Sequence, residues 1–557
     1  MKRANLCAAS VLLLAFGGLA LLPLTRSVVR SDARMASGET GLGATLQDLG
    51  LRKEDLPLGG IGPMPSRANL RDPAPGSELE VRLANAVQLE SPQKWAALQQ
   101  LVKDFPDQPA AHAALVRFAC KNGGSVGIGR SEQQERLSPP KPQQATNYTH
   151  VGPNPQDIAL MVTSGEAGER LDPGNAYFSA MTAIAYFAAE EDGKAQAALH
   201  RAAEKKIWRE YIDVELKGHE LRAERLGRTG NSLARTARMA SILFPHYAQL
   251  RAMSRIATVQ AMDKEVAGDI KGGLEIRRDT KAVGKIMRLQ GSSLITNLVG
   301  MAMERIAMSR PGGAPATKAE EREESDSRFI SWLDKHTTSE EAQAWKQDLP
   351  KQNAVKEIAS KGGAFSIFGS GGMAETVFRS VAGMVLLSAV VLLCLLSGLS
   401  FGKRVLGRTG SHTGMAVSVV AFLGVLSWLT WNMLGGVRDA LAMNSLIQGL
   451  SGGEGTGLPP TIIAALWREG VLMGVTALAL PIGLFFVAVL GSRPGKPSRG
   501  GILRHYALPL AAVFAVIYAV HTISFGMREK AVHAELSQMS AHEGRYLAGK
   551  LGRTWPE

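Results

Sequence analysis

The sequence contains few residues that covalent chemistry could use. Its 557 residues include only three cysteines, Cys7, Cys120 and Cys394. Cys7 and Cys394 lie in apolar, membrane-type segments, so Cys120 has no second thiol in the region between them. A disulfide framework within one chain is therefore excluded. The simplest interpretation of Cys120 is a small buried apolar residue.

Motifs for catalysis and cofactor binding are also absent. There is no Walker A loop, no G-x-S-x-G elbow and no dinucleotide-binding glycine pattern. His219-Glu220 begins a zinc-protease-like pattern, but the second histidine is missing. His533 and His542 would lie on different faces of a helix, which disfavours a metal site. We expect no catalytic residue, no cofactor and no metal, and whether the protein is an enzyme stays open, with the negative answer favoured.

The chain is basic, yet it lacks the patterns of a nucleic-acid-binding protein. The net charge is +13, from 63 basic and 50 acidic residues, but no basic stripe with interleaved aromatics is present. Part of the excess lies in short loops beside apolar segments, where it sets membrane orientation. Between Arg222 and Arg238, arginines recur at near-helical spacing. Because glutamates interleave with them, a solvated helix face is favoured over a patch for anionic headgroups or an envelope polyanion.

Long apolar runs dominate the C-terminal part of the chain. A run of about 20 apolar residues spans a bilayer core of roughly 30 Å. The sequence predicts four such spans in a membrane domain over residues 376–525, at 381–401, 413–434, 470–490 and 506–525. Gly470 and Gly474 allow close contact between membrane helices. No span carries a central charged residue, which argues against a proton- or ion-coupled transporter.

The N-terminus carries an export signal. Lys2 and Arg3 precede an apolar run that ends at Leu24. Residues 1–24 are a signal peptide or a signal anchor, and the length of the run favours the uncleaved anchor. Basic loops follow the first and third predicted spans, so both loops are expected in the cytoplasm. This places the large middle region and a tail at 526–557 outside the cytoplasm of a bacterial inner membrane.

Helical periodicity characterises the middle region. Residues 25–77 form a flexible tether, and an apolar pattern typical of helices then runs over 78–310. A polar insertion at 121–155 has few apolar anchors and is expected to be disordered or a surface flap. Charged helices and a glycine-rich hinge occupy 311–375. The predicted fold is therefore all-α.

Leu171–Trp208 resembles the tetratricopeptide repeat family. The matching positions are Ala183, Tyr186, Ala195, Leu199 and Ala202. The family's Trp-x-x-Leu-Gly opening is absent, and Ile207 stands where a closing proline is usual. The resemblance implies paired helices that pack closely at the small residues. Because a repeat needs neighbours to bury its apolar face, we expect the helices of 78–310 to stack in one array; an unrelated all-helical domain is the alternative.

These features predict a membrane-anchored extracytoplasmic scaffold. Its partners would be the lipid bilayer and one or more proteins of the cell envelope, with no nucleic acid. The alternative is a subunit of a membrane transport or export complex, in which a large external domain follows the first span.

Overall fold

The computed structural model describes residues 2–21, 76–89, 91–120, 124–137, 153–225, 244–309, 319–362 and 499–557, together with isolated positions between these ranges. The chain divides into two compact units. One comprises residues 1–72, 227–241 and 367–536, and the other, here called the helical body, comprises 73–226, 242–366 and 537–557.

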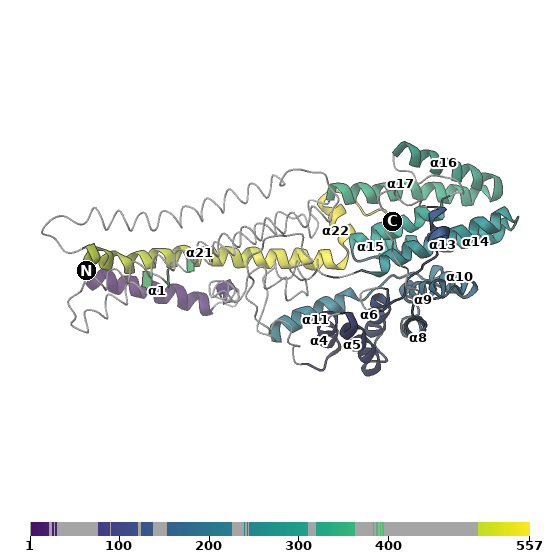
Figure 1. The fold of residues 1–557 in the computed structure, drawn as a ribbon. Helices are drawn as coiled ribbons and strands as arrows, with labels where there is room; N and C mark the ends of the chain where they lie inside the picture. Colours follow the sequence, from purple (N-terminus) through teal and green to yellow (C-terminus); the bar gives the residue numbers. More distant parts are fainter. Residues whose placement is uncertain are drawn as a thin grey trace. The chain divides into compact units, whose positions relative to one another are not determined.

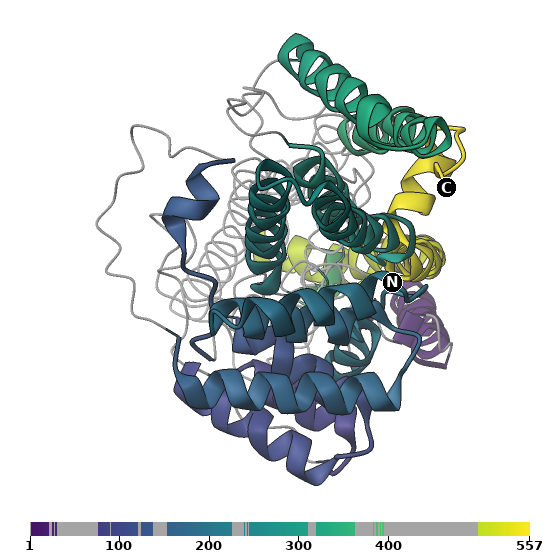
Figure 2. The same cartoon turned by 90° about the vertical axis from the view of Figure 1, so that its right-hand side faces the viewer.

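The described residues confirm the all-α prediction. They contain no β-strand, and the only bridge among them is the isolated one between Asn175 and Ile207. Figure 1 labels the helices, and Figure 2 shows the helical body's earlier helices in purple and blue and its later ones in green. The helices of this body are α4 (Leu79–Val87), α5 (Ser91–Asp104), α6 (Pro109–Ala119), α7 (Ser131–Glu135), α8 (Pro155–Leu171), α9 (Ala176–Ala188), α10 (Asp192–Ala203), α11 (Ile212–Arg225), α13 (His246–Val266), α14 (Ile270–Gln290), α15 (Leu294–Ala307), α16 (Ala319–His336), α17 (Ser339–Gly362) and α22 (Glu543–Lys550).

Local sequence explains where several helices begin. Pro155 occupies the first turn of α8, where its missing N–H costs nothing. The Asn175 side chain accepts a hydrogen bond from Tyr177 N at the start of α9, and Ser293 does the same for Thr296 N at the start of α15. A turn at Gly268-Asp269 separates α13 from α14. Gly268 has a φ of +93°, which a residue with a side chain rarely adopts.

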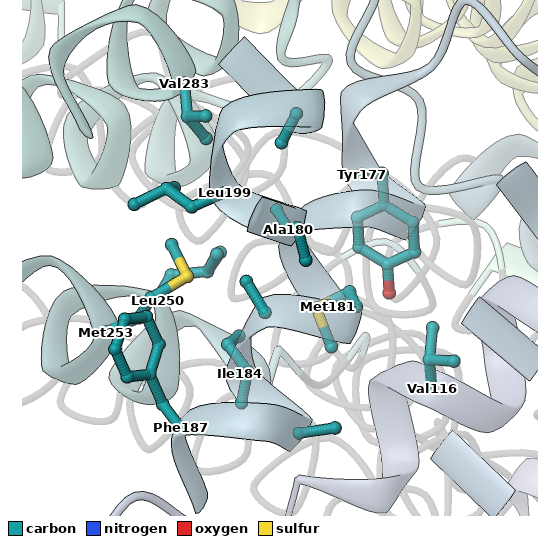
Figure 3. Packing of buried hydrophobic residues seen from close by; sticks show 14 of the residues in the cluster. Val116, Tyr177, Ala180, Met181, Ile184, Phe187, Leu199, Leu250, Met253 and Val283 are labelled. Carbon is teal, nitrogen blue, oxygen red and sulfur yellow. The ribbon is translucent and has the colours of Figure 1, made fainter. Parts of the chain in front are cut away.

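The main core of the helical body surrounds α9. Nearly every α9 side chain is buried, so this helix is covered on all sides rather than on one stripe. Figure 3 shows how Tyr177 and Met181 of α9 lie near Val116 of α6, while Leu199 of α10 lies near Leu250 of α13. One apolar cluster thus joins α6, α9, α10, α13 and α14.

A stacked array of equal repeats is not established by these helices. Within residues 78–310 the helix lengths run from 5 residues in α7 to 21 in α13 and α14, so no constant period is visible. The α9–α10 pair, on which the family resemblance rests, packs together as a helical hairpin. The finer, repeat-based assignment therefore rests on this one pair.

Part of the predicted insertion at 121–155 is packed into the body. Val126 and Ile128 are buried in the main core, and α7 follows them. The Ile128 N–H donates to Gln249 Oε1 at 2.7 Å, and Ser125 N donates to Asp157 Oδ2 at 2.9 Å. Two apolar side chains and these buried polar anchors hold the segment, which composition alone could not indicate. Residues 138–152 lie outside the described part.

The sequence suggested a tail over residues 526–557. In the structure, residues 537–557 instead belong to the helical body. Leu547 and Ala548 of α22, with Trp555 beyond it, are buried against Val355 and Ile358 of α17. We call residues 542–557 the C-terminal clasp. Arg553 donates two hydrogen bonds to the Glu357 carboxylate, at 2.6 and 3.0 Å. The clasp therefore belongs to the helical body, and its apolar burial and ion pairs hold it there.

The other unit contains α1 (Lys2–Leu21) and most of α21 (Arg499–Ala541). Among the described helices, one is long and apolar enough to cross a membrane, over Leu508–Ala541, with a mean hydropathy of 1.9. It contains most of the span predicted at 506–525, and Val513 and Val520 expose 54% and 64% of their surface there. At 43 residues, α21 is about 65 Å long and extends beyond any bilayer core. Apart from isolated positions, the spans predicted at 381–401, 413–434 and 470–490 lie outside the described residues.

Candidate functional site

The described residues contain no group of three or more His, Cys, Asp or Glu side chains arranged to hold a metal. Cys120 is fully buried, and burial raises the pKa of its thiol well above the usual range. The thiol is therefore protonated at neutral pH and is no nucleophile. What the helical body contains instead is a set of buried polar side chains, which we call the polar centre: Lys94, Arg117, Tyr177, Glu210, Glu215, His219, His246, Tyr247 and Thr296.

One half of the polar centre is built around Glu210, just before α11. Its carboxylate accepts hydrogen bonds from His246 Nε2 at 2.8 Å, from the Tyr247 hydroxyl at 3.1 Å and from the Thr296 hydroxyl at 3.2 Å. His246 and Glu210 expose 0% and 2% of their side chains. A buried carboxylate needs such donors to offset its desolvation. Glu210 thereby joins the starts of α13 and α15.

His246 is neutral in this environment. Burial lowers its pKa more strongly than the neighbouring Glu210 carboxylate raises it, and the Arg117 charge adds to the lowering. Since Nε2 donates to Glu210, Nδ1 carries no proton, and it has no hydrogen-bond partner among the described atoms. The Tyr177 ring packs edge-on against the imidazole with a centroid distance of 5.7 Å.

The other half pairs Arg117 of α6 with Glu215 of α11. These side chains hydrogen-bond to each other and expose 2% and 4% of their surface. Burial acts to raise the pKa of Glu215, but Arg117 and His219 outweigh it and lower the pKa to about 2. Glu215 is therefore ionised at neutral pH. Because Arg117 also interacts electrostatically with Tyr177 and Glu210, the two halves form one electrostatic unit.

The N-terminus of α15 joins the polar centre to the C-terminal clasp. Thr296 contacts Glu210, and two residues earlier Leu294 N donates to Glu543 Oε2 at 2.8 Å. Glu543 N in turn donates to Ser292 O at 2.7 Å. Segments that return to the helical body at residue 242 and at residue 537 thus meet at one helix end.

The residues predicted to pack in the repeat lie on α9 and α10. Ala183, Ala195, Leu199 and Ala202 expose at most 1% of their surface, whereas Tyr186 is only partly buried. Tyr186 donates to Glu166 Oε1 at 3.4 Å. Gly470 and Gly474 lie outside the described residues.

The prediction of a solvated arginine face is wrong at its first position. Arg222 lies on α11 and exposes only 5% of its surface. Arg225 is partly exposed and pairs with Glu78. Arg228, Arg235 and Arg238 lie outside the described part of the chain. Spacing along the helix did not reveal which positions α4 covers.

Comparison with known proteins assigns no family to this chain. No protein-family model matches it, and no curated protein and no solved structure shows a significant match.

The polar centre predicts loss of stability in acid. Burial lowers the pKa of His246, so its contribution to stability is present above the ordinary histidine value of about 6.5 and is lost progressively as the pH falls from there towards the lowered pKa. The contribution of Glu215 is present above about 4.5 and is lost as the pH falls towards 2. We expect the melting temperature to fall steadily from pH 7 to pH 4, as followed by tryptophan fluorescence.

The His246→Gln variant separates this contribution from general acid effects. It keeps an N–H donor for Glu210 but removes the titrating ring. The melting temperature of this variant should therefore fall less steeply between pH 7 and pH 5 than that of the wild type. His336→Gln, at an exposed histidine of α16, is the matched control and should keep the wild-type slope. Equal slopes in all three proteins would contradict the assignment.

Proposed function

We propose that this protein is a membrane-anchored scaffold whose helical body binds protein partners in the cell envelope. The observation that carries the proposal is the C-terminal clasp. Residues 537–557 pack into the helical body, and α21 runs unbroken from its apolar part to Ala541. The body is therefore fastened directly to a helix that is long and apolar enough to span a membrane. Such fastening suits a domain that must be held at a bilayer surface.

In its full form, the proposal places the protein in a bacterial inner membrane with several spans and with the helical body outside the cytoplasm. The charge pattern of the predicted loops supports this orientation. The clasp adds a parity condition: residues 242–366 and 537–557 share one body, so we expect them on the same side of the bilayer. The chain between them must then cross an even number of times, as four spans do.

Reporter fusions test this topology. A reporter that is active only outside the cytoplasm should be active when fused after Gly362 and after Glu557, and inactive when fused after Gly407. The physical reason is that basic residues stay in the cytoplasm while the helical body cannot be divided by a bilayer. If only one of the fusions after Gly362 and Glu557 is active, the parity condition is contradicted. If both are inactive and the fusion after Gly407 is active, the orientation is contradicted.

One observation favours a second candidate, a subunit of a transport or export complex. The chain passes between the two units at residues 72, 226, 241, 366 and 536. A passive anchor needs one such passage, whereas several passages suit a body whose movements are coupled to membrane segments.

Affinity purification after cross-linking in intact membranes distinguishes the two functions. The scaffold predicts an envelope-assembly protein cross-linked to the helical body, and the transport candidate predicts an ATPase. A chain lacking residues 78–350 is the control and should lose the scaffold partner. Recovery of the same proteins with and without these residues would contradict a binding role for the helical body.

A further inference from the structure

The Arg117 half of the polar centre has more buried cationic groups than its own carboxylate satisfies. Arg117 gives one nitrogen to Glu215, and its Nε and its other terminal nitrogen are buried with no hydrogen-bond partner among the described atoms. A buried, charged donor without an acceptor is costly, because it has lost water and gained nothing in exchange. Arg117 is 98% buried, so bulk solvent does not supply the acceptor.

A second cation lies beside it. Lys94 of α5 exposes 8% of its surface and makes no hydrogen bond or ion pair with the residues that the structure describes. Its Nζ lies 5.0 Å from the centroid of the Phe118 ring, and the Arg117 guanidinium lies 4.8 Å from the same centroid. Both cations therefore lie against one ring, and burial together with the Arg117 charge lowers the pKa of Lys94 although Glu215 opposes this. Among the residues that the structure describes, Glu215 is the one carboxylate that pairs with Arg117 or Lys94.

We propose that Lys94 and Arg117 bind a small inorganic anion in the interior of the helical body, between α5, α6 and α11. The two partnerless N–H groups of Arg117 and the ammonium of Lys94 are its donors. Charge-assisted hydrogen bonds of this kind are the strong ones. His219, 3.7 Å from Glu215, and the buried Arg222 also lie on α11, and the Glu210 carboxylate acts on Arg117 from the other half of the polar centre. The bound anion fastens α5 and α6 to α11 and supplies the acceptor that the described residues do not provide.

The test uses the full-length protein in detergent, with ionic strength held constant by sodium gluconate, whose anion is too bulky for a buried site. Replacement of gluconate by chloride or by sulfate should raise the melting temperature saturably, because a ligand that binds only the folded state stabilises it. We expect a rise of about 3–6 °C at saturation. If both ions raise the melting temperature, the site accepts a monatomic and a tetrahedral anion. If chloride alone raises it, the site accepts only a monatomic ion.

Two variants make the test specific. Lys94→Met keeps the length of the side chain and the Arg117–Glu215 pair. It should lower the affinity for the anion at least tenfold. Lys103→Met, at an exposed lysine of the same helix, should bind as the wild type does. Equilibrium dialysis with radiolabelled sulfate and chloride gives the stoichiometry directly, without reference to stability. The proposal is overturned if the wild type binds neither ion, or if Lys94→Met binds as tightly as Lys103→Met.

Discussion

Replacing Trp555 with alanine is expected to destabilise the helical body by about 3–5 kcal/mol, the usual cost of removing a buried aromatic side chain. Trp555 exposes 7% of its surface and lies over Gly544, where an added Cβ would come within 2.5 Å of the ring. It also packs edge-on against His542, with a centroid distance of 5.4 Å. The ring therefore fills the space between the chain end and α22, and its loss leaves a cavity.

The measurement is thermal unfolding of the full-length protein, supported by limited proteolysis of the clasp. Arg545→Ala is the matched control, because Arg545 lies in α22 but pairs only with the exposed Glu557, at 3.4 Å. Exposed pairs contribute about 0–1 kcal/mol. If Trp555→Ala melts within a degree of the control, and protease cleaves the clasp as readily in the wild type as in the variant, residues 542–557 do not belong to the helical body.

Breaking the Arg288–Glu304 pair is expected to cost about 3–5 kcal/mol, because an uncompensated charge then stays in the interior. Both side chains are 0% exposed, and Arg288 Nε donates to Glu304 Oε1 at 2.7 Å. Arg288 also donates to Pro556 O at 3.0 Å, so the pair holds the chain end. Burial raises the pKa of Glu304 even though Arg288 opposes it, which shows how little solvent reaches the carboxylate.

Three variants define this cost. Arg288→Met removes the cation alone and should show the full loss. Arg288→Met/Glu304→Leu removes both charges and should recover most of it, since an apolar pair of similar volume needs no compensation. Arg278→Met breaks the exposed Arg278–Glu341 pair of the same helix, for which about 0–1 kcal/mol is expected. Equal losses for Arg288→Met and Arg278→Met would contradict the interior position of the first pair.

Features that depend on neighbouring residues could be predicted from the sequence. Helix α15 (Leu294–Ala307) rests on such local signals, because its apolar residues recur at helical spacing and Ser293 caps its start. The turn at Gly268-Asp269 is local too. The all-α class follows from many such signals together.

Features that depend on residues far apart in the sequence could not be predicted from it. Thr296 and Glu210 are 86 positions apart, and Leu294 and Glu543 are 249 apart, so no periodicity links them. His246 and Glu210 look like ordinary polar residues until folding buries both. The same holds for Trp555, whose position near the end of the chain suggested a tail. Only the path of the chain brings the polar centre and the clasp to one end of α15.

The most direct test of the proposed scaffold function is exchange of the membrane domain. Residues 376–525 would be replaced by an unrelated four-span anchor of the same orientation, and partner cross-linking and growth would be compared with the wild type. A scaffold needs these spans only as an anchor, so both partner binding by residues 78–350 and cellular function should be largely preserved. If binding survives while cellular function is lost, the membrane domain has an activity of its own, and the transport candidate replaces the scaffold.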